Sequence, residues 1–157
     1  MTPTLPAPIH LLGLPVHPLT LQQAVLLVER SILAAQGGPL LHVALNASKV
    51  VLALQSPQLE QDIRAAGMVT ADGAGVLLLA RRLRRQLPER VTGIDLMDAL
   101  CARAAIRRWP VYLLGAAPGV ADDAAAALVA RHPGLRLAGV EHGYFDERDA
   151  GDVARRI

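Results

Sequence analysis

The chain has 157 residues, of which 52% are apolar but only 3% are aromatic, and its formal net charge is +2. This length fits one domain with a core of Leu, Val, Ile and Ala. The near balance of charge and the few aromatic residues exclude a dedicated nucleic-acid binder, which needs a clustered basic face and stacking rings. The one cysteine, Cys101, excludes an internal disulfide and a cysteine-based zinc site and fits a reducing compartment.

Strand and helix patterns alternate along the chain. Residues 9–14 predict a first strand or hairpin arm, and Thr20 with Gln23 three residues later has the spacing of a capping box at a helix start. The other expected elements are a buried strand over 40–45, helices over 48–54 and from Pro57, a short strand over 68–70, helices over 75–85 and 94–107, a strand over 110–114, an alanine-rich helix ending near Arg131, a strand over 135–140 and a last helix from Glu147.

This alternation predicts an α/β, Rossmann-like fold with a largely parallel sheet flanked by helices. We expect residues 1–157 to form a single domain. Because no strand follows the last predicted helix, we expect the sheet to be incomplete at the C-terminus, with an exposed edge that favours a homo-oligomer. The apolar runs are too short to span a membrane, and the N-terminus lacks the basic start of a signal peptide, so we expect a cytoplasmic protein.

Asp72 is the first candidate site residue. It follows the predicted strand over 68–70 and lies in an Asp-Gly-x-Gly turn with Gly73 and Gly75. Ligands of α/β sheets bind at the carboxyl ends of the strands, where such a carboxylate can act as a general base. The structural alternative is that Asp72 only caps a helix. The two glycines allow a close approach of the backbone to a ligand.

Arg90 is the second candidate, and it precedes the Thr92-Gly93 helix start. Its guanidinium can bind the oxygens of a diphosphate in a bidentate manner, or it can be a solvated side chain paired with Glu89. We interpret Asp95 as a stabiliser of the following helix start.

Three further positions are weaker candidates for substrate binding. Asn46 ends the strand over 40–45 and either binds a ligand or terminates the strand. Gly115 opens a strand–turn–helix segment whose helix start can hold a phosphate, although the full dinucleotide fingerprint is missing. Tyr144 belongs to a loop that either anchors itself by packing or stacks on a ligand. The five histidines show no metal-ligand spacing, so no metal site is predicted.

Taken together, these motifs resemble the WecG/TagA/CpsF glycosyltransferases. The shared segments, in order, are Leu45-Asn46-Ala47, Asp72-Gly73-Ala74-Gly75-Val76, Arg90-Val91-Thr92-Gly93-Ile94-Asp95-Leu96-Met97, Leu113-Leu114-Gly115 with Pro118-Gly119-Val120, and Gly143-Tyr144-Phe145. The resemblance implies a bacterial enzyme that moves a hexose-type sugar from a UDP-sugar donor to a polyprenyl-diphosphate-linked saccharide acceptor. It further implies peripheral association with the inner face of the plasma membrane, inversion at the anomeric carbon, and no metal or other cofactor.

The resemblance also implies site roles. Asp72 corresponds to the family's proposed base and Arg90 to a proposed site residue, while the substrate-binding positions carried over are Asn46, Gly73, Gly75, Thr92, Gly93, Gly115 and Tyr144. Two departures stand out. Ala44 occupies a position where the family usually has threonine, and the family continues with a Gly-x-Pro-x-Gln-Glu motif and a basic, membrane-associating tail beyond the position of Ile157.

These departures lead us to expect little or no activity from residues 1–157 alone. The rival interpretation is a non-catalytic domain that binds UDP or another nucleotide, or an interaction module. Binding of UDP without sugar transfer would identify this rival. A nicotinamide dehydrogenase is disfavoured because the glycine fingerprint is missing.

Overall fold

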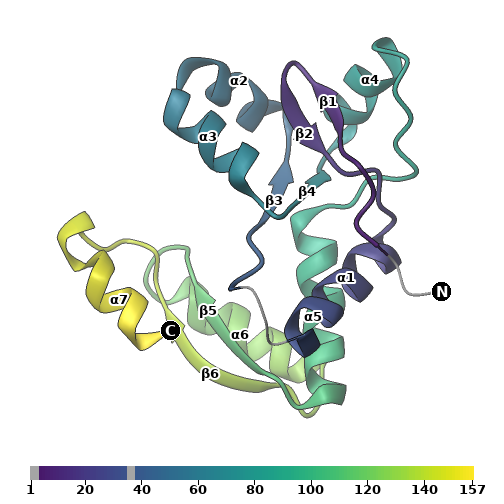
Figure 1. Ribbon diagram of the computed structural model, residues 1–157. Helices are drawn as coiled ribbons and strands as arrows, with labels where there is room; N and C mark the ends of the chain where they lie inside the picture. The colour runs from purple at the N-terminus through teal and green to yellow at the C-terminus, as the bar shows by residue number, and fades with distance from the viewer. Residues whose placement is uncertain (1–3, 35–37) are drawn as a thin grey trace. The chain divides into compact units, whose positions relative to one another are not determined.

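The computed structural model describes residues 4–34 and 38–157, which form an α/β fold (Figure 1). The chain divides into two compact units, Met1–Leu96 and Met97–Ile157. The elements up to residue 92 are β1 (Ile9–Leu11), β2 (Leu14–Val16), α1 (Leu21–Ala34), β3 (His42–Leu45), α2 (Ala47–Gln55), α3 (Pro57–Ala65), β4 (Met68–Ala71) and α4 (Ala74–Arg82). Those that follow are α5 (Gly93–Arg107), β5 (Pro110–Leu114), α6 (Val120–Arg131), β6 (Arg136–Glu141), a 3₁₀ turn (Glu147–Asp149) and α7 (Ala150–Arg156).

The described strands form three two-stranded ladders. β3 pairs with β4 and β5 pairs with β6, both in parallel, whereas β1 and β2 form an antiparallel hairpin. The sequence prediction of an α/β class with parallel strands and flanking helices is therefore confirmed. The parallel strands lie in two short pairs, one in each unit.

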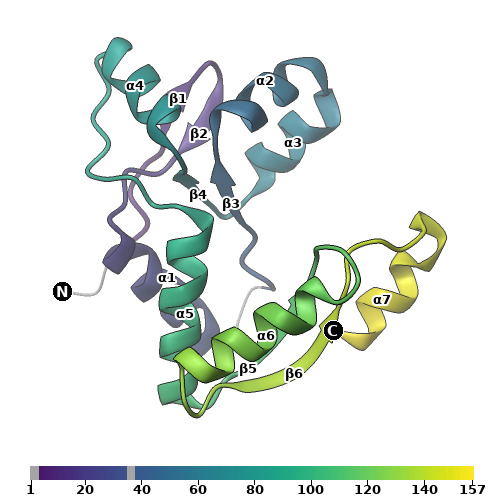
Figure 2. The same ribbon diagram turned by 180° about the vertical axis from the view of Figure 1, so that it is seen from behind.

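The hairpin explains the ambiguous pattern over residues 9–14. Leu12 and Gly13 both have positive φ angles, 50° and 84°, so they form a two-residue turn that pairs Ile9 with Val16. Leu11, Leu14 and Val16 are buried in the core of the first unit. In Figures 1 and 2 this hairpin lies between α4 on one side and the α2–α3 pair on the other.

Helix starts in the first unit follow the capping residues of the sequence. The predicted capping box is present, since Thr20 N–H donates to Gln23 Oε1 at 2.9 Å and Gln23 N–H donates to Thr20 Oγ1 at 3.2 Å. Ser56 caps α3 through Leu59 N–H, and Pro57 occupies the first turn. The helix expected over 75–85 ends earlier, at Arg82, because the chain turns at Arg84 with a φ angle of 55°.

The edge of β4 that does not face β3 is occupied by residues from outside the sheet. His17 N–H donates to Val69 O at 2.8 Å, and Val69 N–H donates to His17 Nδ1 at 3.0 Å. Further along the strand, Val91 N–H donates to Ala71 O at 2.9 Å. All four residues of β4 are buried as a result.

The second unit packs α6 along the β5–β6 pair, as Figure 2 shows. Its core contains Cys101 and Ala104 of α5 together with Leu128 and Leu135. Cys101 is buried in α5, and this burial raises the pKa of its thiol. Trp109, Val111, Leu113 and Leu137 pack around this core.

Among residues 4–34 and 38–157, no helix combines the length and the apolar character needed to cross a bilayer.

The protein should lose stability as the pH falls below about 6.5. Burial lowers the pKa of His17 and of His42 below the usual 6.5, so the unfolded chain binds these protons more readily than the folded one. The nitrogen of His17 that accepts Val69 N–H must also carry no proton. Urea unfolding at about pH 7.5 and about pH 5.5 should therefore give the larger free energy of unfolding at the higher pH.

Replacement of His17 by glutamine should reduce this pH dependence, whereas the same change at the exposed His10 serves as the control. An unfolding free energy that is flat across this pH range would contradict the prediction.

Candidate functional site

Asp72 lies directly after β4, where its backbone N–H donates to Leu45 O at 2.8 Å and so continues the β3–β4 ladder. Its carboxylate does not cap α4, the helix that follows, since the N-cap residue of α4 is Gly73 and no side chain caps this helix. Instead, Asp72 Oδ2 accepts the N–H of Gly93 at 3.3 Å, the first residue of α5. The carboxylate is thus oriented by one backbone donor and is partly exposed, which is an arrangement suited to a base.

Gly73 gives the Asp72 turn its shape. It has a φ angle of 99° and a ψ angle of 156°, a conformation that is accessible essentially to glycine alone. Gly75 contributes differently, because a Cβ atom at this position would lie 3.2 Å from Ala47 Cβ. The two glycines therefore allow the turn after β4 to lie close to the start of α2.

Replacement of Gly73 by alanine should destabilise the protein by roughly 1–3 kcal/mol, because the backbone would be strained or would move. Gly151 in α7 provides the control, since its alanine variant should be neutral or more stable by up to about 1 kcal/mol. Thermal unfolding of both variants measures the difference, and equal melting temperatures would show that the Gly73 conformation is not required.

Arg90 and Thr92 flank Val91, whose backbone N–H and carbonyl are both hydrogen-bonded to residues of β4. Val91 is buried, its N–H donates to Ala71 O, and its carbonyl accepts the Thr70 hydroxyl at 3.1 Å. This double attachment fixes the 90–92 segment along β4 next to the Asp72 turn. The Arg90 side chain is exposed, and within the described ranges it forms no hydrogen bond or ion pair.

Glu89 does not pair with Arg90, contrary to the structural alternative. Its carboxylate accepts the N–H of Leu21, at the start of α1. The acid therefore stabilises a helix N-terminus, and Arg90 keeps its guanidinium available for a ligand.

His42 and Thr70 form a link that the sequence analysis missed. The ring nitrogen Nε2 of His42 lies 2.9 Å from Thr70 Oγ1. Since the Thr70 hydroxyl donates to Val91 O, His42 must be the donor in this contact. Burial lowers the pKa of His42, nearby Lys49 lowers it further, and Asp72 acts in the opposite direction. The sequence signal available for this link was the alternation of side chains along β3, which places His42 on the same face of the strand as Ala44.

Asn46 caps α2, with its Oδ1 accepting Lys49 N–H at 2.9 Å. The Lys49 side chain turns back, and its ammonium donates to Ala44 O at 2.8 Å. Capping uses the oxygen of the Asn46 amide, so its NH₂ group is the part that can donate to a ligand. Similarly, Thr92 Oγ1 accepts Asp95 N–H at 3.0 Å and caps α5. Asp95 lies in the first turn of this helix, as expected.

Gly115 and Tyr144 lie in the second unit, at the ends of β5 and β6. Gly115 N–H donates to Glu141 O at 3.0 Å, and Gly143 N–H donates to Ala116 O at 2.8 Å. A Cβ atom on Gly143 would lie only 3.0 Å from Gly115 Cα, so glycine allows the two loops to touch. Tyr144 is 75% exposed, which excludes the alternative that its ring anchors the loop by packing.

Glu141 links β6 to β5 and to α7 through side-chain hydrogen bonds. Its carboxylate accepts the Tyr112 hydroxyl at 2.6 Å and two N–H groups of Arg156, from Nε at 2.6 Å and from Nη2 at 2.8 Å. These bonds lower the pKa of Glu141 to about 2, with the Arg156 guanidinium as the largest cause. Glu141 is therefore a structural anion that holds α7.

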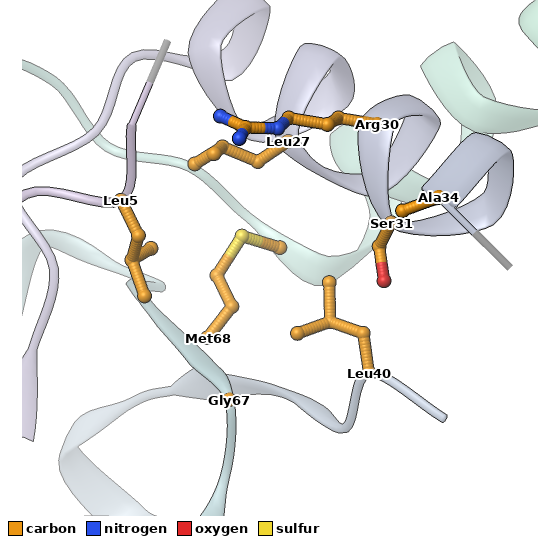
Figure 3. A pocket seen from close by; sticks show the side chains of 8 residues that line it. All are labelled: Leu5, Leu27, Arg30, Ser31, Ala34, Leu40, Gly67 and Met68. Carbon is orange, nitrogen blue, oxygen red and sulfur yellow. The ribbon is translucent and has the colours of Figure 1, made fainter. Parts of the chain in front are cut away.

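Figure 3 shows an apolar pocket of about 250 Å³ at the opposite end of β4 from Asp72. Gly67 and Met68 form its floor at the start of the strand, and Leu27 of α1 and Leu40 point into it. It contains none of the predicted site residues. In the described part of the chain, no cluster of three His, Cys, Asp or Glu side chains could hold a metal ion.

A comparison with known proteins now decides the family. The sequence model of the glycosyl transferase WecG/TagA/CpsF family matches residues 9–157. The chain belongs to the WecG/TagA/CpsF glycosyltransferase family.

Curated relatives are found in Staphylococcus aureus, in strains that include NCTC 8325 / PS 47, COL and MRSA252. Each is 39% identical over 93 residues and bears the name N-acetylglucosaminyldiphosphoundecaprenol N-acetyl-beta-D-mannosaminyltransferase. The match covers 59% of this chain and 36% of each relative, so the chain spans about a third of their length.

In this WecG/TagA/CpsF member, the first unit brings together most of the predicted site. Gly93 donates to Asp72, and the bond from Val91 to Ala71 places Arg90 and Thr92 in a loop segment beside β4. Asn46 follows the neighbouring strand β3, whose last residue pairs with Ala71. Gly115 and the loop of Tyr144 form a second cluster in their own unit.

Proposed function

We propose that this protein is an inverting glycosyltransferase that transfers a sugar from a UDP-linked donor to a polyprenyl-diphosphate-linked saccharide. The observation that carries the proposal is the Asp72 carboxylate, oriented by Gly93 N–H beside the Arg90 segment. The name of the relatives supports N-acetylmannosamine as the sugar and undecaprenyl-diphosphate-linked N-acetylglucosamine as the acceptor.

In the proposed reaction, the acceptor hydroxyl loses its proton to Asp72 while its oxygen attacks the anomeric carbon of the donor. The bond from that carbon to UDP breaks at the same time, so one displacement inverts the configuration. Asp72 Oδ1 is the oxygen that takes the proton, because Oδ2 is bonded to Gly93 N–H. Arg90 stabilises the negative charge that develops on the departing diphosphate.

The smaller groups of the site would bind and orient the substrates. The NH₂ group of Asn46 and the hydroxyl of Thr92 can donate to sugar or phosphate oxygens, since only their acceptor atoms are used in capping. Gly73 and Gly75 leave room for a ligand to approach the backbone of the turn. Gly115 and Tyr144 are proposed as further contacts, with Tyr144 offering an exposed ring for stacking.

The test is a transfer assay with the full-length gene product. UDP-N-acetylmannosamine and a water-soluble undecaprenyl-diphosphate-N-acetylglucosamine analogue are supplied, and the β-linked disaccharide product is measured by mass spectrometry and NMR. We expect product with inverted anomeric configuration. Binding of UDP without transfer to any lipid-linked acceptor would favour a non-catalytic nucleotide-binding domain instead.

A further inference from the structure

The end of α4 carries a dense positive charge for which the proposed reaction has no use. Arg81, Arg82, Arg84 and Arg85 are all exposed, and in the part of the chain that the structure describes their side chains form no hydrogen bond or ion pair. Residues 73–89, which leave out Arg90 of the proposed site, contain four arginines and one glutamate, a net charge of +3, although the whole chain has a net charge of only +2. The positive charge is thus concentrated on this segment, and the remainder is slightly negative.

Exposed leucines accompany these arginines. Leu78 is 67% exposed and Leu83 is 43% exposed. Leu78 lies three and four residues before Arg81 and Arg82, so the three side chains share one face of the helix. Val76 and Ala80, on the other face, are buried in the core. An exposed apolar side chain that lies beside arginines can enter the interface of a bilayer whose phosphates the arginines bind.

A groove lies beside the arginines. Arg81 and Arg85 line one part of it, and the start of α1, with Thr20 and Gln23, lines another. The side-chain oxygens of Thr20 and Gln23 accept each other's backbone N–H, so the Thr20 hydroxyl and the Gln23 NH₂ group can donate to a ligand beside the two guanidinium groups. Two guanidinium groups around one hollow match the geometry and charge of a phosphate group.

We propose that the Arg81–Arg85 surface binds an anionic phospholipid bilayer, with phosphate headgroups on the arginines and with Leu78 and Leu83 entering the interface. The role of this surface depends on the proposed function, in which the acceptor is lipid-linked. Helix α4 starts directly after the Asp72 turn, and nine residues span about 13 Å. Contact of the far end of α4 with the bilayer therefore holds the Asp72 carboxylate about one helix length from the headgroups. A lipid-linked saccharide projects from the bilayer into this region.

A nucleic acid fits this surface less well than a bilayer does. Single-stranded nucleic acids are bound by stacking on aromatic rings, and residues 73–90 contain none. The exposed leucines also favour a ligand that has an apolar layer beneath its phosphates.

The experiment is co-sedimentation of residues 1–157 with lipid vesicles that contain neither substrate. We expect binding to vesicles of phosphatidylglycerol and phosphatidylcholine, little binding to phosphatidylcholine alone, and loss of binding at high salt. The R81Q/R85Q variant should bind the anionic vesicles about thirtyfold more weakly. The R108Q/R136Q variant, which removes the same charge from exposed positions of the second unit, should bind as the unaltered protein does.

Leu78→Ser should weaken vesicle binding without changing its salt dependence, and an unchanged partition would overturn insertion of the leucines. Equal binding by R81Q/R85Q and the unaltered protein would overturn the proposal as a whole. So would a loss of UDP affinity in R81Q/R85Q with vesicle binding intact, because the groove would then hold the nucleotide diphosphate. Since no substrate is present in the vesicle assay, its outcome is separate from that of the transfer assay.

Discussion

Replacement of Asp72 by asparagine is expected to lower sugar transfer by about 10²-fold or more, since the amide cannot accept the proton of the attacking hydroxyl. The fold should be unchanged, because asparagine has nearly the same shape and its side-chain oxygen can still accept Gly93 N–H at the observed 3.3 Å. The measurement is kcat of the full-length gene product with saturating donor and acceptor, together with circular dichroism to confirm folding.

Asp62 provides the matched control for this variant. Its carboxylate is exposed on α3, where it accepts a hydrogen bond from Gln58 at 2.9 Å. The D62N variant should therefore transfer sugar as the unaltered protein does. If D72N keeps near-normal turnover, Asp72 has no part in the proton transfer, and another carboxylate must be sought.

Arg90→Ala should reduce turnover by about 10²-fold, because positive charge would be lost where the diphosphate leaves. Arg90→Lys should remain impaired, since a lysine keeps the charge but cannot form the bidentate contact of a guanidinium. The protein itself should tolerate both changes, because Arg90 is exposed and the segment is held through Val91. Steady-state kinetics and calorimetric titration with UDP measure the two effects.

Arg136→Ala, at an exposed position of β6, is the control for the loss of one arginine. It should change neither turnover nor UDP affinity. Unaltered kinetics and UDP binding in Arg90→Ala would remove Arg90 from the site.

Local features of the fold were predictable from sequence. The capping box at Thr20, the proline-started helix at Pro57 and the strand over 110–114 depend on neighbouring residues, and the structure places all three as expected. The turn after β4 was also predictable, because glycine at positions 73 and 75 permits the positive φ angle and the close approach to α2 that this turn has.

Contacts between distant residues were not predictable in the same way. The alternation of strands and helices did not reveal that the described strands form separate pairs. Glu89 was weighed as a partner of Arg90, its neighbour in sequence, yet it bonds to Leu21, which is 68 residues away. The link from His42 through Thr70 to Val91 likewise depends on how two strands and a loop meet. Such partners are selected by tertiary packing, which a local pattern does not contain.

The attachment of His17 and Val91 to the edge of β4 has a consequence for how the site forms. His17 joins Val69 across 52 residues, and Thr70 joins Val91 across 21 residues. Neither contact can form before the chain between its partners has closed into a loop, which carries an entropic cost. The Arg90 segment therefore becomes ordered together with the hairpin and the β3–β4 pair rather than on its own. Substitutions in the hairpin, which contact no substrate, should consequently alter both hydrogen exchange at Val91 N–H and the position of Arg90.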